Sequence, residues 1–405
     1  MSTNTIPDAG DVFAFGESEI RRAAGELWPA ATVELGAHVP SVTGYVRRLR
    51  VDGRPLYAKH SVLGISLVSL LLGAAGGWDQ VRAAQREYVA RPDALLTREA
   101  GQLRVLAEMG RPRVCAVAGH HRGAGVLFTV PAPGPSLATL LLAEPHRAQD
   151  LLEATYRELE RLHRPSALRF LDPAGVIVER GIEATFRRKF NGLSGGTYLA
   201  NLGAQRCTPR VRGEVVPGMR AVVARLLRPR VAVPPVGGGV LVYGDLKPEH
   251  VFFAGGAGRP PVLIDPGLMR GLSPVGDLAK LISRTVLLLT ARAPGPRVVR
   301  QVESALGAFA QVRMEVVPPG LRAAALGELV SLWLMDTINI MTTYLSAPAA
   351  LPLPAQGEAL VLRASAVVGM LHRLAGQLAT SWDSPAAVVR EALSGAVPVL
   401  APRAS

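Results

Sequence analysis

Two aspartates that follow short apolar runs constrain this chain more than any other feature of its sequence. Asp245 comes shortly after the run 240–243, and Asp265 directly follows the run 262–264, twenty residues further along. Short apolar runs between polar or glycine-rich turns are typical of strands. A carboxylate just beyond a strand stands on a loop that a rigid scaffold positions, where binding and catalytic residues concentrate. The two aspartates are therefore candidates for residues of this kind.

Length and composition indicate a large folded protein. The chain has 405 residues, 49% of them hydrophobic and 19% charged, which excludes a disordered chain and suggests two or three packed units. Two cysteines, Cys115 and Cys207, are too few for a disulfide framework or a cysteine-based zinc site. Residues 1–16 contain no basic, apolar leader, so we expect a cytoplasmic protein.

Strand patterns come first along the chain and helical patterns follow. Residues 45–60 form two strand-like runs around Asp52-Gly53, a dipeptide that favours a tight hairpin turn. We expect a helix over 98–109 and strands at 114–117 and 126–130. The proline-rich segment 131–135 then predicts a hinge. Beyond it we expect mainly helices, notably over 149–163, 321–345 and 358–378.

The charge is concentrated in one segment. Residues 180–230 contain eleven Lys and Arg against two Glu, and they supply most of the net charge of +13. A basic segment attracts acidic ligands. It contains few aromatic residues and no recognisable binding motif, so we expect no nucleic acid as a partner.

An uncharged stretch of eighteen residues, 61–78, has about the minimum length for crossing a bilayer. Its glycines and serines weaken that interpretation. A buried helix or hydrophobic flap is favoured, and a membrane partner is not expected.

The motifs around the two aspartates resemble a known family. The chain contains Tyr243-Gly-Asp-Leu-Lys-Pro-Glu-His250, then Leu263-Ile-Asp-Pro-Gly267, then Gly276-Asp-Leu-Ala-Lys-Leu281. This order resembles the aminoglycoside phosphotransferase and choline kinase branch of the protein-kinase-like phosphotransferases, over roughly residues 33–289. The resemblance implies an α+β, two-lobe fold. It has a small β-rich N-lobe (1–130, with an apolar insertion at 61–95), a hinge (131–135) and a larger, mainly helical C-lobe (136–405).

The resemblance also implies roles for residues of the C-lobe. Asp245 would orient the acceptor hydroxyl and take its proton, and Lys247 would place a positive charge near the transferred phosphate. Asp265 would bind the metal ion that bridges the β- and γ-phosphates of ATP. Asp277 would brace the catalytic loop. His163 also resembles a family residue, but a packed or capping histidine is favoured over a ligand-binding one.

In the N-lobe, the resemblance implies that Lys59 contacts the nucleotide phosphates. Its ion-pair partner would be Glu99, with Glu87 as a rival because some forty residues separate Lys59 from Glu99. No GxGxxG loop is present, so the turn at 41–44 would have to cover the phosphates with its backbone amides. The remaining nucleotide contacts would come from Ser41, Thr43 and Gly44 in this turn and from Val130 at the hinge.

His250 departs from the family pattern, which has asparagine at this position to offer an oxygen to the metal. Magnesium prefers oxygen ligands, and imidazole is a poorer match. Three interpretations are open: His250 binds a metal such as Mn²⁺, it leaves the metal to Asp265 and water, or it marks a weakened activity. The implied cofactors are therefore ATP and Mg²⁺, with Mn²⁺ as the alternative metal.

The implied function is ATP-dependent transfer of the γ-phosphoryl group to a hydroxyl, in secondary metabolism. The basic segment, including Arg187, Arg188 and Lys189, favours an acidic small-molecule or peptide acceptor and would repel cationic aminoglycosides. One alternative is a Ser/Thr kinase of a ribosomally made precursor peptide, which acts with a lyase partner protein. Another is a catalytically weak, kinase-like scaffold.

Overall fold

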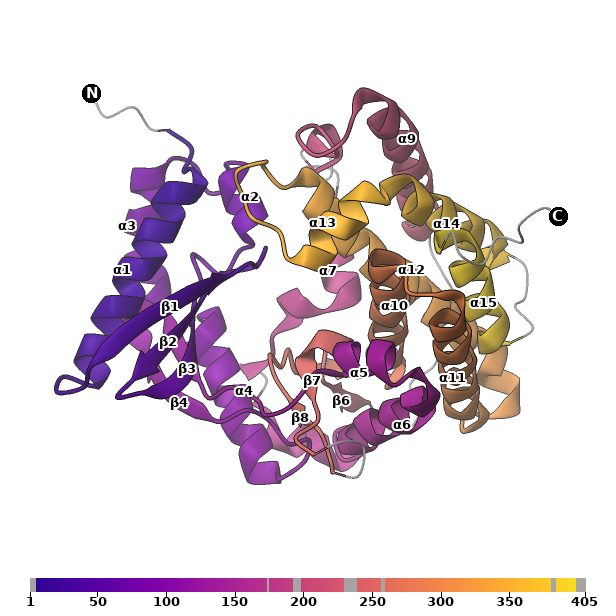
Figure 1. The fold of residues 1–405 in the computed structure, drawn as a ribbon, viewed down its shortest axis with the longest axis horizontal. Coiled ribbons are helices and arrows are strands. Elements are labelled where there is room, and N and C mark those ends of the chain that lie inside the picture. Colours follow the sequence, from indigo (N-terminus) through magenta and orange to yellow (C-terminus); the bar gives the residue numbers. More distant parts are fainter. Residues whose placement is uncertain are drawn as a thin grey trace.

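The computed structural model describes residues 5–172, 175–191, 198–228, 239–255, 259–379 and 384–397. They form two lobes, a smaller one built on a sheet and a larger one built from helices (Figure 1). Residues 130–136 connect the last strand of the small lobe to the first helix of the large one. The predicted α+β, two-lobe architecture is confirmed. Parts of the basic segment, residues 192–197 and 229–230, lie outside the described residues.

The N-lobe contains a five-stranded antiparallel sheet. Its order is β1-β2-β3-β5-β4, and its strands are β1 (Val33–Val39), β2 (Tyr45–Val51), β3 (Arg54–His60), β4 (Val117–His121) and β5 (Val126–Thr129). Val51 pairs with Arg54 across the predicted hairpin turn. Asp52 and Gly53 both have positive φ angles, 48° and 75°, as a turn of this kind requires.

Two elements of the N-lobe differ from the expectation. The helix predicted over 98–109 begins a turn earlier, as α4 (Leu95–Met109). The strand predicted at 114–117 begins only at Val117, because Val114 instead forms a parallel bridge with Leu263 of the C-lobe. A further helix, α1 (Ala9–Leu27), packs its buried Ile20 against the sheet and had not been predicted.

The uncharged stretch 61–78 is not a membrane-spanning helix. It holds the short helix α2 (Leu67–Leu71) and leads into α3 (Trp78–Ala90). Leu67 and Leu70 of α2 are each 1% exposed, as expected for a buried helix. Among the described residues, only the segment 319–346 is long and apolar enough to span a membrane as a single helix, and most of it is buried in the protein core.

The C-lobe is a helical assembly with two short strand pairs. Strand β6 (Val240–Val242) pairs with β9 (Met269–Gly271), and β7 (Val251–Phe252) pairs with β8 (Val262–Leu263). The apolar runs at 240–243 and 262–264 therefore contain the strands predicted for them. The principal helices are α5 (Leu137–Ala143), α6 (Ala148–Leu159), α7 (Ile182–Lys189), α9 (Pro209–Leu226), α10 (Val275–Arg292), α11 (Pro296–Glu315), α12 (Arg322–Ser346), α13 (Ala355–Leu362), α14 (Ala364–Gly376) and α15 (Pro385–Ala396).

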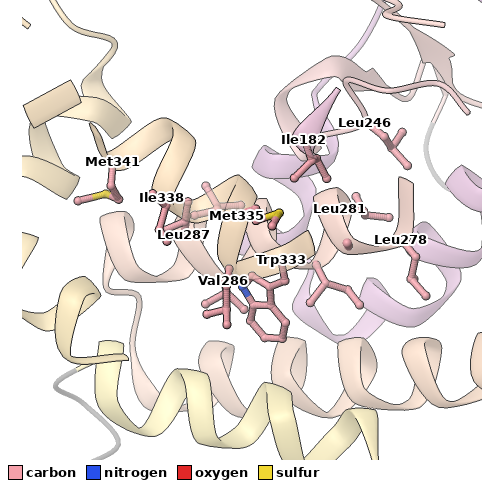
Figure 2. Packing of buried hydrophobic residues seen from close by; sticks show 14 of the residues in the cluster. Ile182, Leu246, Leu278, Leu281, Val286, Leu287, Trp333, Met335, Ile338 and Met341 are labelled. Carbon is pink, nitrogen blue, oxygen red and sulfur yellow. The ribbon is translucent and has the colours of Figure 1, made fainter. Parts of the chain in front are cut away.

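Helices α10 and α12 form the centre of the C-lobe core. Figure 2 shows Trp333 and Met335 of α12 beside Val286 and Leu287 of α10, all at most 1% exposed. Ile182 of α7 and Leu246 of the loop after β6 belong to the same cluster. The loop that carries Asp245 is thus anchored in this core by Leu246, which is 0% exposed.

Candidate active site

The loop after β6 is shaped by hydrogen bonds to Asp277. The backbone N–H groups of Tyr243 and Gly244 donate to its two carboxylate oxygens, at 2.7 and 2.8 Å. His163 Nε2 lies 3.0 Å from Oδ2 of the same carboxylate. The predicted structural roles of Asp277 and His163 are confirmed. Gly244 has a φ of +78°, and a Cβ there would lie 2.2 Å from the carbonyl oxygen of Gly267, so only glycine fits.

Asp245 projects from this loop into a group of basic side chains. Lys247 Nζ lies 3.2 Å from its Oδ2, and Lys280 Nζ lies 3.0 Å from its Oδ1. Burial by itself would raise the pKa of Asp245, but the charges of Lys247, Lys280 and further neighbours outweigh burial and hold it well below its usual range. Asp245 is therefore an ionised carboxylate, as an acceptor of a hydroxyl proton must be.

Lys59 joins the two lobes through two carboxylates. Its Nζ donates to Glu99 Oε1 at 2.8 Å and also to Asp265 Oδ1. Burial opposes the charge on Lys59, but Asp265 and Glu99 more than compensate, so its pKa is raised. Glu99 is fully buried, whereas Glu87 is exposed. The partner of Lys59 is therefore Glu99.

His250 lies between the two aspartates. Its Nδ1 is 3.6 Å from Asp245 Oδ2, and its Nε2 is 3.5 Å from Asp265 Oδ2. Burial, followed by the nearby Lys247, lowers the pKa of His250 to about 3, so the imidazole is neutral. The buried Nδ1 has no hydrogen-bond partner among the described residues.

These side chains fit a metal ion that is only partly coordinated by protein. No group of three or more His, Cys, Asp or Glu in the described part of the chain is arranged to hold a metal by itself. Mg²⁺ in phosphotransferases commonly takes one or two protein carboxylates and completes its shell with phosphate oxygens and water. Asp265 and Nε2 of His250, the ring nitrogen that faces Asp265, suit that arrangement.

The predicted nucleotide contacts of the N-lobe lie beside β1, β2 and β5. Ser41 and Thr43 belong to the β1–β2 turn, where Thr43 N donates to Ser41 Oγ at 3.3 Å. Gly44 approaches the carbonyl of His60, which a Cβ would meet at 3.0 Å. The N–H of Val130 donates to the Ala116 carbonyl at 2.9 Å.

The three residues predicted to bind the acceptor do not share one surface. Arg187 is exposed and pairs with Glu183, and Arg188 is exposed and donates to the Glu179 carbonyl. Lys189 is 7% exposed and points into the protein. Its Nζ donates to Asn339 O at 2.6 Å and to the hydroxyls of two threonines on α12. Lys189 is therefore part of the α7–α12 packing, which corrects the picture of three surface cations.

Other cations of the basic segment also have internal partners. Arg206 donates to the carbonyls of Pro348 and Leu351, at 2.6 and 2.5 Å, and Arg212 donates to those of Leu202 and Ala200. Much of the positive charge of this segment therefore satisfies backbone carbonyls at helix ends and turns rather than forming an open binding surface.

Sequence reasoning missed two basic residues of the site. Lys280 lies three residues after Asp277 on α10, and this spacing could have indicated that both face the catalytic loop. Arg180 pairs with Glu99, and Arg180 Nη1 donates to the Pro266 carbonyl at 2.6 Å. No local signal could have identified Arg180, because its partners lie some eighty residues away on either side.

Comparisons with known proteins return only solved structures. No family model matches the chain, and no curated protein matches it. A choline kinase from Cryptosporidium parvum is 8% identical over 90% of this chain and 94% of its own, with a TM-score of 0.43. An ADP-bound aminoglycoside phosphotransferase, APH(2'')-Ib, is 15% identical over 80% and 90%, with a TM-score of 0.40.

An ethanolamine kinase from Plasmodium vivax is 9% identical over 98% of this chain and 92% of its own, with a TM-score of 0.38. These proteins come from the branch that the sequence motifs resemble. At such identities and TM-scores the likenesses assign no activity to this chain. Its function has to be inferred from the site.

Proposed function

We propose that this chain is an ATP-dependent phosphotransferase that acts on a hydroxyl group. One arrangement supports this most strongly. Lys59 bridges Glu99 and Asp265. Asp245 stands on the loop after β6, and His250 lies between the two aspartates. Phosphoryl transfer needs phosphates, metal and acceptor to be held in line, and it needs little covalent help from the protein.

Each side chain has a role in this reaction. Lys59 contacts the nucleotide phosphates, and Glu99 fixes its position. Asp245 orients the acceptor hydroxyl, whose oxygen bonds to the γ-phosphorus as the bond from phosphorus to the β–γ bridging oxygen breaks. ADP leaves, and the hydroxyl proton passes to the Asp245 carboxylate. Lys247 stabilises negative charge on the transferred group.

Asp265 and His250 would hold the divalent metal ion, which supplies charge neutralisation at the β- and γ-phosphates. Both side chains lie on the side of the site that faces Lys59 and the N-lobe, as shown by the contacts of Asp265 with Lys59 and of His250 with Asp265. A bound nucleotide would therefore meet the metal and Lys59 together.

We further propose that the acceptor is acidic, either a small molecule or a peptide. Lys247 is 25% exposed beside Asp245, and Arg187 and Arg188 are exposed on α7. Cationic hydroxyl compounds are disfavoured by the same charges. No observation favours the ribosomal-peptide kinase or the inactive scaffold over this assignment.

The test uses γ-labelled ATP with Mg²⁺ or Mn²⁺ and matched panels of acidic, neutral and cationic hydroxyl compounds, including acidic serine peptides. We expect label transfer to acidic acceptors, weakened by added salt. Transfer to cationic compounds alone would contradict the acceptor class. Absence of ATP binding by a folded sample with either metal would contradict the phosphotransferase assignment.

A further inference from the structure

Helix α4 of the N-lobe is linked to a segment of the C-lobe by two neighbouring ion pairs. The cation lies on α4 in one pair and on the C-lobe segment in the other. Arg98 and Glu99 are neighbours on α4, and Glu179 and Arg180 are neighbours in a short 3₁₀ turn, Val178–Arg180. Arg98 pairs with Glu179, and Glu99 pairs with Arg180. Each dipeptide thus offers one cation and one anion to the other.

Backbone groups strengthen the same contact. Arg98 Nη1 donates to the Val176 carbonyl at 2.7 Å. Gln102, one turn further along α4, donates Nε2 to the carbonyls of Gly175 and Leu268, at 2.7 and 3.0 Å. The Leu268 N–H returns a hydrogen bond to Gln102 Oε1 at 2.8 Å. One face of α4 is therefore held by residues 175–180 and by the segment that follows Asp265.

Arg180 connects this contact to the reacting groups. Its guanidinium binds Glu99 on one side and donates to the carbonyl of Pro266, next to Asp265, on the other. Its side chain also packs over Gly267, where a Cβ would lie 3.0 Å from Arg180 Cβ. Arg180 thus links Glu99 of α4 to the segment around Asp265 from the C-lobe side. Lys59 links the same two groups from the N-lobe side.

Glu99 needs this second partner. Its side chain is 0% exposed, and a carboxylate without water is stable only when it is paired. In the proposed reaction, Lys59 turns part of its charge toward the phosphates. Arg180 would keep Glu99 neutralised and in place while that happens.

We propose that residues 175–180 form a clip that fixes α4 for catalysis before nucleotide binds, with Arg180 as a positioning residue for Glu99 and Lys59. The clip rests on the phosphotransferase function proposed above, because it regulates that same site. With this clip, contacts within the chain hold α4 in its working position, and neither a modification nor a partner protein is needed.

The test reverses the outer ion pair, which lies beside the reacting groups without touching them. In the purified full chain, Glu179→Arg should lower ADP release from ATP with Mg²⁺ or Mn²⁺, with water as acceptor, by about tenfold and raise the KM for ATP. Backbone amides of α4 should exchange faster with deuterium. The double variant Arg98→Glu/Glu179→Arg should recover most of both properties.

Asp93→Arg is the matched control, because Asp93 forms an exposed ion pair with Arg91 just before α4 and should leave both readouts unchanged. If Glu179→Arg does not fold, Glu179→Gln should give a smaller change in the same direction. Unchanged turnover and exchange in a Glu179 variant, or no recovery in a folded double variant, would overturn the clip.

Two further outcomes separate the proposals. In the wild type, α4 should be equally protected from exchange with and without ATP, and protection that appears only with ATP would overturn a preassembled clip. If the wild type neither binds ATP nor releases ADP, the proposed function fails. The exchange data on Glu179→Arg and its rescue would still decide whether the clip exists.

Discussion

At the scale of single residues, the roles proposed for Asp245 and Asp265 can be tested separately. Asp245→Asn should lower turnover by at least about a hundredfold, because a positioned base contributes on that order, while ATP binding remains. Asp265→Asn should weaken metal-dependent ATP binding as well as turnover, since it would remove the proposed metal ligand. Steady-state kinetics and calorimetric titration with ATP distinguish the two. Near wild-type turnover in either variant would remove its assigned role.

His250 offers a second test at the same scale. If its imidazole binds the metal, the wild type should work better with Mn²⁺ than with Mg²⁺, because nitrogen ligands suit Mn²⁺ better. His250→Asn restores an oxygen ligand and should lower the ratio of the Mn²⁺ rate to the Mg²⁺ rate. An identical ratio in both proteins would show that His250 only packs against the two aspartates.

At the scale of elements, the contact between α7 and α12 depends on a buried lysine. Burial, with a smaller contribution from Arg188, lowers the pKa of Lys189 to about 7 from an unfolded value near 10.5. The three oxygen partners of Lys189 act against this shift, because both threonine hydroxyls already donate to backbone carbonyls of α12 and can only accept from the lysine. The effect of burial is larger, so the net pKa is lowered. Folding therefore tends to release a proton between these two pH values.

This release makes stability depend on pH. Between about pH 7 and pH 10, Lys189 is protonated in the unfolded chain but mostly neutral in the folded one. The free energy of unfolding should therefore rise with pH over this range, by a few kcal/mol. Lys189→Met should flatten this rise, measured by denaturant unfolding at several pH values. Arg187→Met, an exposed neighbour, should keep the wild-type slope. An equal slope in Lys189→Met would contradict the assigned pKa.

At the scale of the whole molecule, nucleotide binding should stabilise both lobes together. The site takes Lys59 from the N-lobe and Asp265 from the C-lobe, so ATP with a divalent metal would bind only the folded chain. The Tm should increase with ATP concentration, by an amount that corresponds to about 2.7 kcal/mol at a hundred times the Kd. Omitting the metal should remove most of the increase, and a Tm insensitive to ATP would contradict the prediction.

The sequence by itself determined the features that depend on near neighbours. The hairpin at Asp52-Gly53 follows from residues that accept positive φ angles, and the strands before Asp245 and Asp265 follow from short apolar runs. The bracing role of Asp277 followed from its place in a motif of fixed spacing.

Only the tertiary structure decided how distant charges pair. It selected Glu99 over Glu87, brought Arg180 to Glu99 and turned Lys189 inward, away from the surface predicted for it. Local preference does not encode these choices, because each depends on which helix faces cover one another. A buried charge must find its partner among whatever groups the packed elements bring within reach, and that set exists only once those elements have packed together.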